Sequence, residues 1–207
     1  MAPRKNWSAA GAWWRALVLV LAAWVVVAAI ALASYLSLSV VAVPIVVGVV
    51  LTIGFVVAVV GVHQAFWLGF LALLPGVAVL VGAVQYAPEA ALEFRGERAE
   101  VTVADVEVSG KRHEFDLVRT ADGVALGETL VYQGSSPPYA VGTTLAVLVD
   151  PEGEVSMEVA DRVDPAGKMA LLLAGGGAWS VIGAYAARRG LLRRRQGKSL
   201  HDTPALY

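Results

Sequence analysis

The chain has 207 residues, of which 57% are hydrophobic and only 16% carry a charge. Soluble domains usually carry about 25% charged residues, so this composition points to lipid as part of the solvent. The absence of cysteine excludes disulfides, thiolate catalysis and cysteine-ligated metal centres. The formal net charge of −1 gives no reason to expect a polyanionic partner.

Charge is segregated along the chain. Residues 87–165 hold 16 acidic and 6 basic side chains, whereas the stretch 188–198 holds six basic side chains and no acidic one. Arg4, Lys5 and Arg15 make residues 1–15 basic as well. Two basic ends thus flank an acidic segment, and basic residues mark the cytoplasmic side of membrane helices.

Four stretches of the chain contain no Asp, Glu, Lys or Arg. A helix rises about 1.5 Å per residue, so about 20 apolar residues cross the ~30 Å hydrocarbon core of a bilayer. Many of these residues are Val, but in hydrocarbon the backbone must satisfy its own hydrogen bonds, so helix is the expected state. Transmembrane helices are therefore predicted at 16–33, 40–62, 65–84 and 169–187.

The charge bias also predicts the direction of each helix. With residues 1–15 in the cytoplasm, three crossings place residues 87–165 outside, and the fourth returns the basic tail, 188–207, to the cytoplasmic side. An even number of helices before the acidic segment is disfavoured, because it would leave that tail outside. Ala31-Leu32-Ala33 resembles a signal-peptidase site. We expect the first helix to be retained as a signal anchor, with cleavage after Ala33 as the alternative.

From Ala99 onward the apolar pattern has a period of two, which indicates β-strands. Ala104-Asp105 shifts the phase of the first strand and predicts a β-bulge, and Asp122-Gly123 predicts a hairpin turn. Five short strands in about 65 residues predict a small, partly closed all-β barrel of the OB or SH3-like kind. The strands are predicted at 100–108, 113–119, 126–133, 143–149 and 155–159.

Three segments carry a family resemblance: the opening strand Ala99–Val103, the loop Gly134–Tyr139, and Val141-Gly142 leading to Leu145–Pro151. Through these three segments, residues 99–163 resemble the bacterial membrane family called domain of unknown function 3592. The resemblance implies a small β domain held between membrane helices. It implies no activity, catalytic residue or cofactor.

His113, Glu114 and Asp116 come nearest to a cluster of metal ligands. On a strand, His113 shares a face with Phe115, and the two carboxylates share the opposite face. We therefore expect a solvated polar strand face and no metal. His63 is expected at a membrane interface, and His201 lies in the polar tail.

Two serines in the third loop of the β region are candidate nucleophiles. No His and acid pair can be assigned to them, and no Gly-x-Ser-x-Gly motif is present. The two following prolines favour a rigid loop instead. We expect this loop to offer an interaction surface, formed by Ser135, Ser136, Pro137, Pro138 and Tyr139.

Gly176, Ser180 and Ala184 recur every fourth residue in the last span and predict a small-residue stripe for close helix contact. Thr52 and Gln85 offer too little polarity for a pore or transport pathway. The basic tail is expected to lie against anionic lipid headgroups, not nucleic acid.

The sequence therefore predicts a multi-pass cell-membrane protein that presents an acidic β domain outside the membrane. The domain is expected to be a non-catalytic interaction or envelope-associated module without a cofactor. Its expected partners are the lipid bilayer and another membrane or envelope protein. The first alternative is an accessory subunit that docks through the last helix, and the second is a membrane-bound enzyme.

Overall fold

A computed structural model describes residues 9–63 and 66–195 of the chain. These residues form two compact units. The helical unit lies within residues 1–84 and 167–207, and the β domain comprises residues 85–166. Residues 4 and 5, together with His201 and Lys198, which figure in the predictions above, lie outside the described residues.

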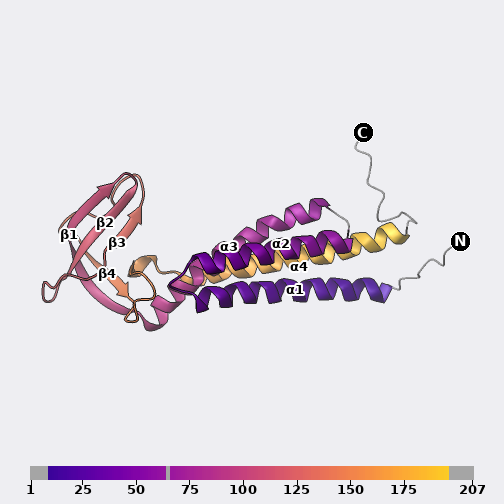
Figure 1. Ribbon diagram of the computed structural model, residues 1–207, viewed down its shortest axis with the longest axis horizontal. Coiled ribbons are helices and arrows are strands. Elements are labelled where there is room, and N and C mark those ends of the chain that lie inside the picture. The colour runs from indigo at the N-terminus through magenta and orange to yellow at the C-terminus, as the bar shows by residue number, and fades with distance from the viewer. Residues whose placement is uncertain (1–8, 64–65, 196–207) are drawn as a thin grey trace. The chain divides into compact units, whose positions relative to one another are not determined.

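The helical unit is built from α1 (Ala9–Leu36), α2 (Ala42–His63), α3 (Phe66–Arg95) and α4 (Pro165–Arg195). Figure 1 shows the four helices running alongside one another, with the start of α1 and the end of α4 at the same end of the bundle. Within the described ranges, four helices are long and apolar enough to cross a membrane. This confirms the predicted set of four long apolar helices and indicates a membrane location.

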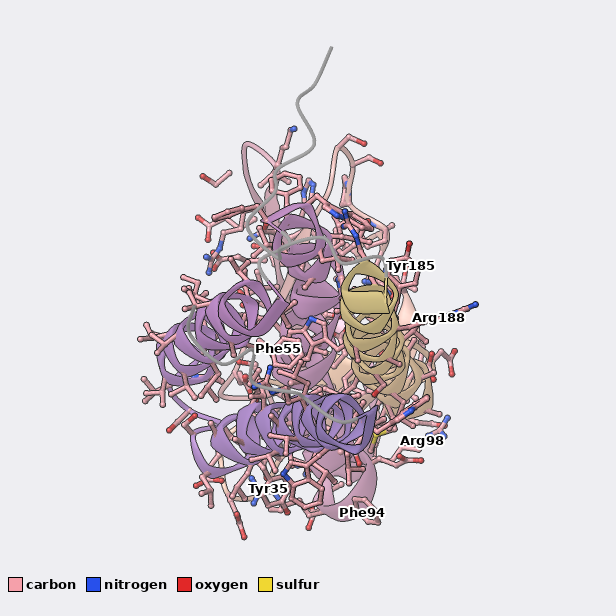
Figure 2. The ribbon with its side chains drawn as sticks, turned by 90° about the vertical axis from the view of Figure 1, so that its right-hand side faces the viewer. Tyr35, Phe55, Phe94, Arg98, Tyr185 and Arg188 are labelled. Carbon is pink, nitrogen blue, oxygen red and sulfur yellow. The ribbon has the colours of Figure 1, made fainter. Side chains whose placement is uncertain are left out.

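The interior of the bundle is organised around Trp179 of α4. Its side chain is fully buried, and its indole Nε1 donates a hydrogen bond of 2.7 Å to the carbonyl oxygen of Ala72 on α3. Its ring lies 4.5 Å from the ring of Phe55 on α2, and Figure 2 shows Phe55 pointing into the space between the helices. One side chain of α4 therefore contacts both α2 and α3.

Helices α3 and α4 approach each other closely at two glycines. A Cβ atom on Gly175 would lie 2.9 Å from the carbonyl oxygen of Pro75, and one on Gly82 would lie 2.8 Å from the amide nitrogen of Leu172. Both distances are to backbone atoms, so neither site can accept a side chain without moving a helix. Small residues at such crossings are typical of helix pairs in membranes.

The predicted small-residue stripe on α4 begins inside the bundle. Gly176 is buried, and a Cβ atom there would lie 3.2 Å from side-chain atoms of Trp24 and Val27 on α1. The hydroxyl of half-buried Ser180 donates to the carbonyl oxygen of Gly176, and Ala184 is exposed. The first member of the stripe thus packs within the chain. Contact between the stripe and a partner protein stays a prediction.

Helix α3 continues well past the predicted span, 65–84, to Arg95. Its last eleven residues belong to the β domain. Polar residues end the hydrocarbon-compatible stretch, but Ala, Leu and Glu are strong helix formers and continue the helix. The side chains that this extension buries are those of Ala87, Ala90, Ala91 and Leu92.

The β domain is a five-stranded antiparallel, nearly closed barrel with the strand order β3-β2-β1-β4-β5. The long first strand pairs with β2 along one edge and with β4 along the other (Figure 1). This arrangement favours the OB alternative over the SH3-like one. The strands are β1 (Glu97–Ser109), β2 (Arg112–Arg119), β3 (Leu130–Gln133), β4 (Thr144–Val149) and β5 (Glu158–Val159).

The barrel core follows the predicted alternation. Val101 and Val103 of β1 are buried with Phe115 and Leu117 of β2 and Val147 of β4. The register between β1 and β2 shifts between Val103 and Asp105, which confirms the predicted bulge. The predicted strand 126–133 is regular only from Leu130, and an isolated bridge between Val118 and Ala125 lies ahead of it. The predicted strand 155–159 is reduced to its last two residues.

Candidate functional site

The loop 134–142, between β3 and β4, has an exposed tip and an anchored end. Ser135, Ser136, Pro137 and Pro138 are exposed, whereas Tyr139 is half-buried. The Tyr139 ring meets the ring of Phe115 edge-on, with the centroids 5.7 Å apart. The Tyr139 ring has a second contact, with Arg162, whose guanidinium carbon lies 5.6 Å from the centre of the ring. Tyr139 therefore ties the predicted interaction loop to the barrel core.

Both ends of this loop are also hydrogen-bonded to strands. The amide of Gly134 donates to the carbonyl oxygen of Lys111 at 2.8 Å, and the amide of Gly142 donates to that of Val103 at 2.8 Å. Gly142 has a φ of +86°, a backbone conformation that favours glycine. The loop tip is thus held between two fixed points, with two prolines to limit its freedom.

His113 lies beneath this loop and is fully buried, so the solvated polar face expected for this cluster is formed by Glu114 and Asp116 and does not include His113. Its Nε2 lies 3.1 Å from the carbonyl oxygen of Gly134, so the proton is on Nε2 and the nitrogen donates. The Tyr132 ring stacks against the imidazole with centroids 6.2 Å apart. Tyr132 covers His113 because the two residues are partners in the β2–β3 pairing.

The predicted division of the polar cluster on β2 is confirmed. His113 and Phe115 are buried, while Glu114 is half-buried and Asp116 is exposed on the opposite face. Among the residues that the structure describes, no group of three or more His, Asp or Glu side chains is arranged to hold a metal ion.

The serine hydroxyls of the loop tip have no base in contact. Within the described part of the chain, no hydrogen bond joins Ser135 or Ser136 to a histidine, and the nearby His113 uses its Nε2 on the Gly134 carbonyl. Nucleophilic catalysis by serine needs a base within hydrogen-bond reach.

A second polar cluster joins the end of α3 to the loop 150–154. Asp150 has a fully buried side chain, and its carboxylate accepts a hydrogen bond of 2.8 Å from Nη2 of Arg95. The same carboxylate accepts hydrogen bonds of 3.0–3.2 Å from the backbone amides of Glu152, Glu154 and Val155. Arg95 also forms ion pairs with the Glu152 and Glu154 carboxylates. One buried acid thus organises the loop after β4 and fixes it to α3.

Protonation of Asp150 should destabilise the β domain. Burial acts to raise the pKa of this carboxyl, but the Glu152 amide, the Arg95 guanidinium and the Val155 amide outweigh it and lower its pKa below the ordinary value. The Val124 amide and Arg119 likewise lower the pKa of Asp122. A lowered pKa contributes stability above the unfolded pKa and loses it as the pH falls through the folded one.

We therefore expect the β domain to keep its stability from pH 7 to about pH 5 and to lose it progressively below about pH 4, near the unfolded pKa of Asp. Thermal unfolding of the full chain in detergent, followed across this range, measures the effect. An Asp150→Asn variant should show a flatter dependence. A midpoint that rises as the pH falls from 5 to 3 would contradict the assignment.

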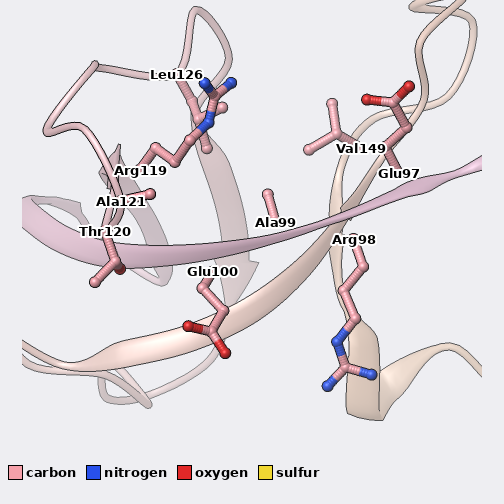
Figure 3. A pocket seen from close by; sticks show the side chains of 9 residues that line it. All are labelled: Glu97, Arg98, Ala99, Glu100, Arg119, Thr120, Ala121, Leu126 and Val149. Atoms are coloured by element: carbon pink, nitrogen blue, oxygen red, sulfur yellow. The ribbon is translucent and has the colours of Figure 1, made fainter.

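An open groove lies beside the first residues of β1, with a volume of about 560 Å³. Figure 3 shows Arg119 and Leu126 on one side of the groove, Glu97 and Val149 on the other, and Ala99 between them. Arg98 and Glu100 point to the opposite face of the strand (Figure 3). Sequence reasoning missed this groove, because its walls come from β1, β4 and the segment after β2.

The comparisons with known proteins add no functional assignment to this geometry. The resemblance to the domain of unknown function 3592 family stays a prediction. No protein-family model, curated protein or solved structure matches the chain.

Proposed function

We propose that this chain is a multi-pass membrane protein that holds its β domain on the extracytoplasmic side as a non-catalytic interaction module. The loop 134–142 is the contact surface. The observation that carries the proposal is the anchored loop: the Tyr139 ring contacts Phe115 and Arg162, while four consecutive residues at the tip are exposed. A preordered loop loses little conformational entropy when it binds.

The proposed orientation is supported by the charges at one end of the helical bundle. Arg15 near the start of α1 and Arg188 near the end of α4 belong to the same end. There the guanidinium of Arg189 lies 5.3 Å from the centre of the Trp67 ring, which meets the Tyr185 ring edge-on at 6.1 Å. Basic residues mark the cytoplasmic side of membrane helices, and Trp and Tyr mark a membrane–water interface.

Docking of a partner through α4 is the second candidate function. It is favoured by the exposed Ala184, one turn from half-buried Ser180. The buried Gly176 cannot contribute to such a surface, since it already contacts α1.

Cysteine labelling tests the orientation directly, because the chain has no native cysteine. In intact cells, a Ser136→Cys variant should react with a membrane-impermeant maleimide. A Ser199→Cys variant in the basic tail should react only after the cells are permeabilised. The reverse pattern would overturn the proposed orientation.

The same substitution tests the loop as a contact surface. A photocrosslinker attached through Ser136→Cys should give a discrete adduct in native membranes. The matched control is Glu107→Cys, an exposed position on the outer face of β1. Adding Tyr139→Ala to the Ser136→Cys chain should abolish the adduct, because the loop loses its anchor. No adduct, or equal adducts from positions 136 and 107, would argue against the loop.

A further inference from the structure

The first residues of β1 have a sheet neighbour on one edge only. The pairing with β4 begins at Glu97, whereas the pairing with β2 begins only at Val101. After Arg119 the chain turns away, and the amide of Thr120 makes the last contact, 3.0 Å from the carbonyl oxygen of Glu100. Residues 97–99 therefore present an open strand edge inside a barrel that is otherwise nearly closed.

The direction of the backbone groups on this edge follows from the alternation of antiparallel pairing. The Glu100 carbonyl points towards β2, since it accepts the Thr120 amide. The Val103 amide points to the other side, since it donates to Thr143 ahead of β4. Backbone groups alternate in direction along a strand, so the N–H and C=O of Arg98 point the same way as the Glu100 carbonyl. They open into the groove beside β1.

The groove has the chemistry of a slot for one extended segment. Its floor and walls include the apolar side chains of Ala99, Leu126 and Val149. Arg119 is neutralised by Asp122 at 3.0 Å. Among the described residues, no ion pair engages Glu97 or Glu100, which leaves two carboxylates on the strand that borders the slot.

We infer that this groove binds an extended peptide segment of a partner protein as an added antiparallel strand beside residues 97–100 of β1. The Arg98 N–H and C=O supply main-chain hydrogen bonds, as in other cases of strand addition. A small apolar side chain of the peptide sits over Ala99. The segment is basic at both ends, because opposite charges directly across a strand pair stabilise the pairing with Glu97 and Glu100. The surrounding domain favours the same sign, with 16 acidic against 6 basic residues in 87–165.

The matching probe follows from the register. A strand antiparallel to Glu97-Arg98-Ala99-Glu100 meets these residues in reverse order, so the complementary peptide is Lys-Val-Glu-Lys with blocked ends. Binding to the full chain in detergent micelles is measured by amide chemical shifts. We expect saturable shifts at Arg98 and Glu100, and about 10-fold weaker binding of the charge-reversed peptide Glu-Val-Lys-Glu. The absence of binding, or equal binding of both peptides, would overturn the inference.

Two substitutions at one position separate strand addition from simple charge attraction. Arg98→Pro removes the N–H that faces the groove and keeps the pairing of Glu97 and Ala99 with β4; proline is tolerated at such open edges. It should weaken binding by about 10-fold or more. Arg98→Ala removes the charge but keeps the N–H, and it should change binding by less than about 3-fold. Equal affinities of the two variants would overturn strand addition.

Hydrogen exchange provides a readout in the unchanged chain, should Arg98→Pro fail to fold. The Lys-Val-Glu-Lys peptide should slow exchange of the Arg98 amide, because that amide becomes a donor to the added strand. An unchanged exchange rate at saturating peptide would overturn the inference. The Tyr139→Ala variant should bind the peptide as the unchanged chain does. The proposal for the groove and the proposal for the loop 134–142 can therefore be refuted independently.

Discussion

Replacing Asp150 by Ala is expected to cost the β domain about 3–5 kcal/mol, since it breaks a buried, hydrogen-bonded ion pair. The carboxylate is fully buried and serves three backbone amides and the Arg95 guanidinium. Without it, the three amides lose this acceptor, and Arg95 keeps only the carboxylates of Glu152 and Glu154. A buried donor left unsatisfied costs more than a hydrogen bond normally contributes. A domain of this size has only about 5–15 kcal/mol of stability in total. We therefore expect substantial unfolding near 37 °C.

Limited proteolysis of the full chain in detergent, over a temperature ramp, measures this loss. The matched control is Glu154→Ala, which removes another carboxylate from Arg95 but from a half-exposed position. Exposed ion pairs contribute little to stability, so this control should stay close to the unchanged chain. If the two variants unfolded at the same temperature, Asp150 would not be the organising residue of the loop.

Replacing Trp179 by Ala is expected to destabilise the helical bundle by about 3–5 kcal/mol. Lipid solvates apolar side chains as well as a protein interior does, so close packing holds membrane helices together. The substitution opens a cavity beside Phe55 and removes the donor to the Ala72 carbonyl. The conservative Trp179→Phe variant keeps most of the ring volume and should lose only about 1 kcal/mol, the size of one hydrogen bond.

Thermal unfolding in mild detergent distinguishes these variants. Trp13→Ala is the control, because the Trp13 side chain is 66% exposed and has no place in the bundle interior. It removes the same side chain from the same chain without opening a cavity. Equal destabilisation by Trp13→Ala and Trp179→Ala would show that the position of the tryptophan in the bundle does not matter.

The elements of the fold could be predicted because their signals are local. Long apolar stretches without charge predict helices, because backbone N–H and C=O groups in hydrocarbon must hydrogen-bond to one another. Alternation along β2 places His113 with Phe115 on the inner face, and the phase change at Ala104-Asp105 marks the bulge seen in the β1–β2 register. Each of these features depends on a few consecutive residues, and backbone geometry alone decides it.

What the sequence by itself determined is therefore the number of apolar helices, the β character of the acidic segment and the segregation of charge. Only the tertiary structure decided which side chains meet. Arg95 and Asp150 are 55 positions apart, and the Trp179 indole reaches a carbonyl 107 positions away. No periodicity encodes such contacts, because they arise when packed elements bring distant residues together. The open edge at residues 97–99 is visible only once both neighbours of β1 are known, since an edge is a property of the sheet and not of the strand.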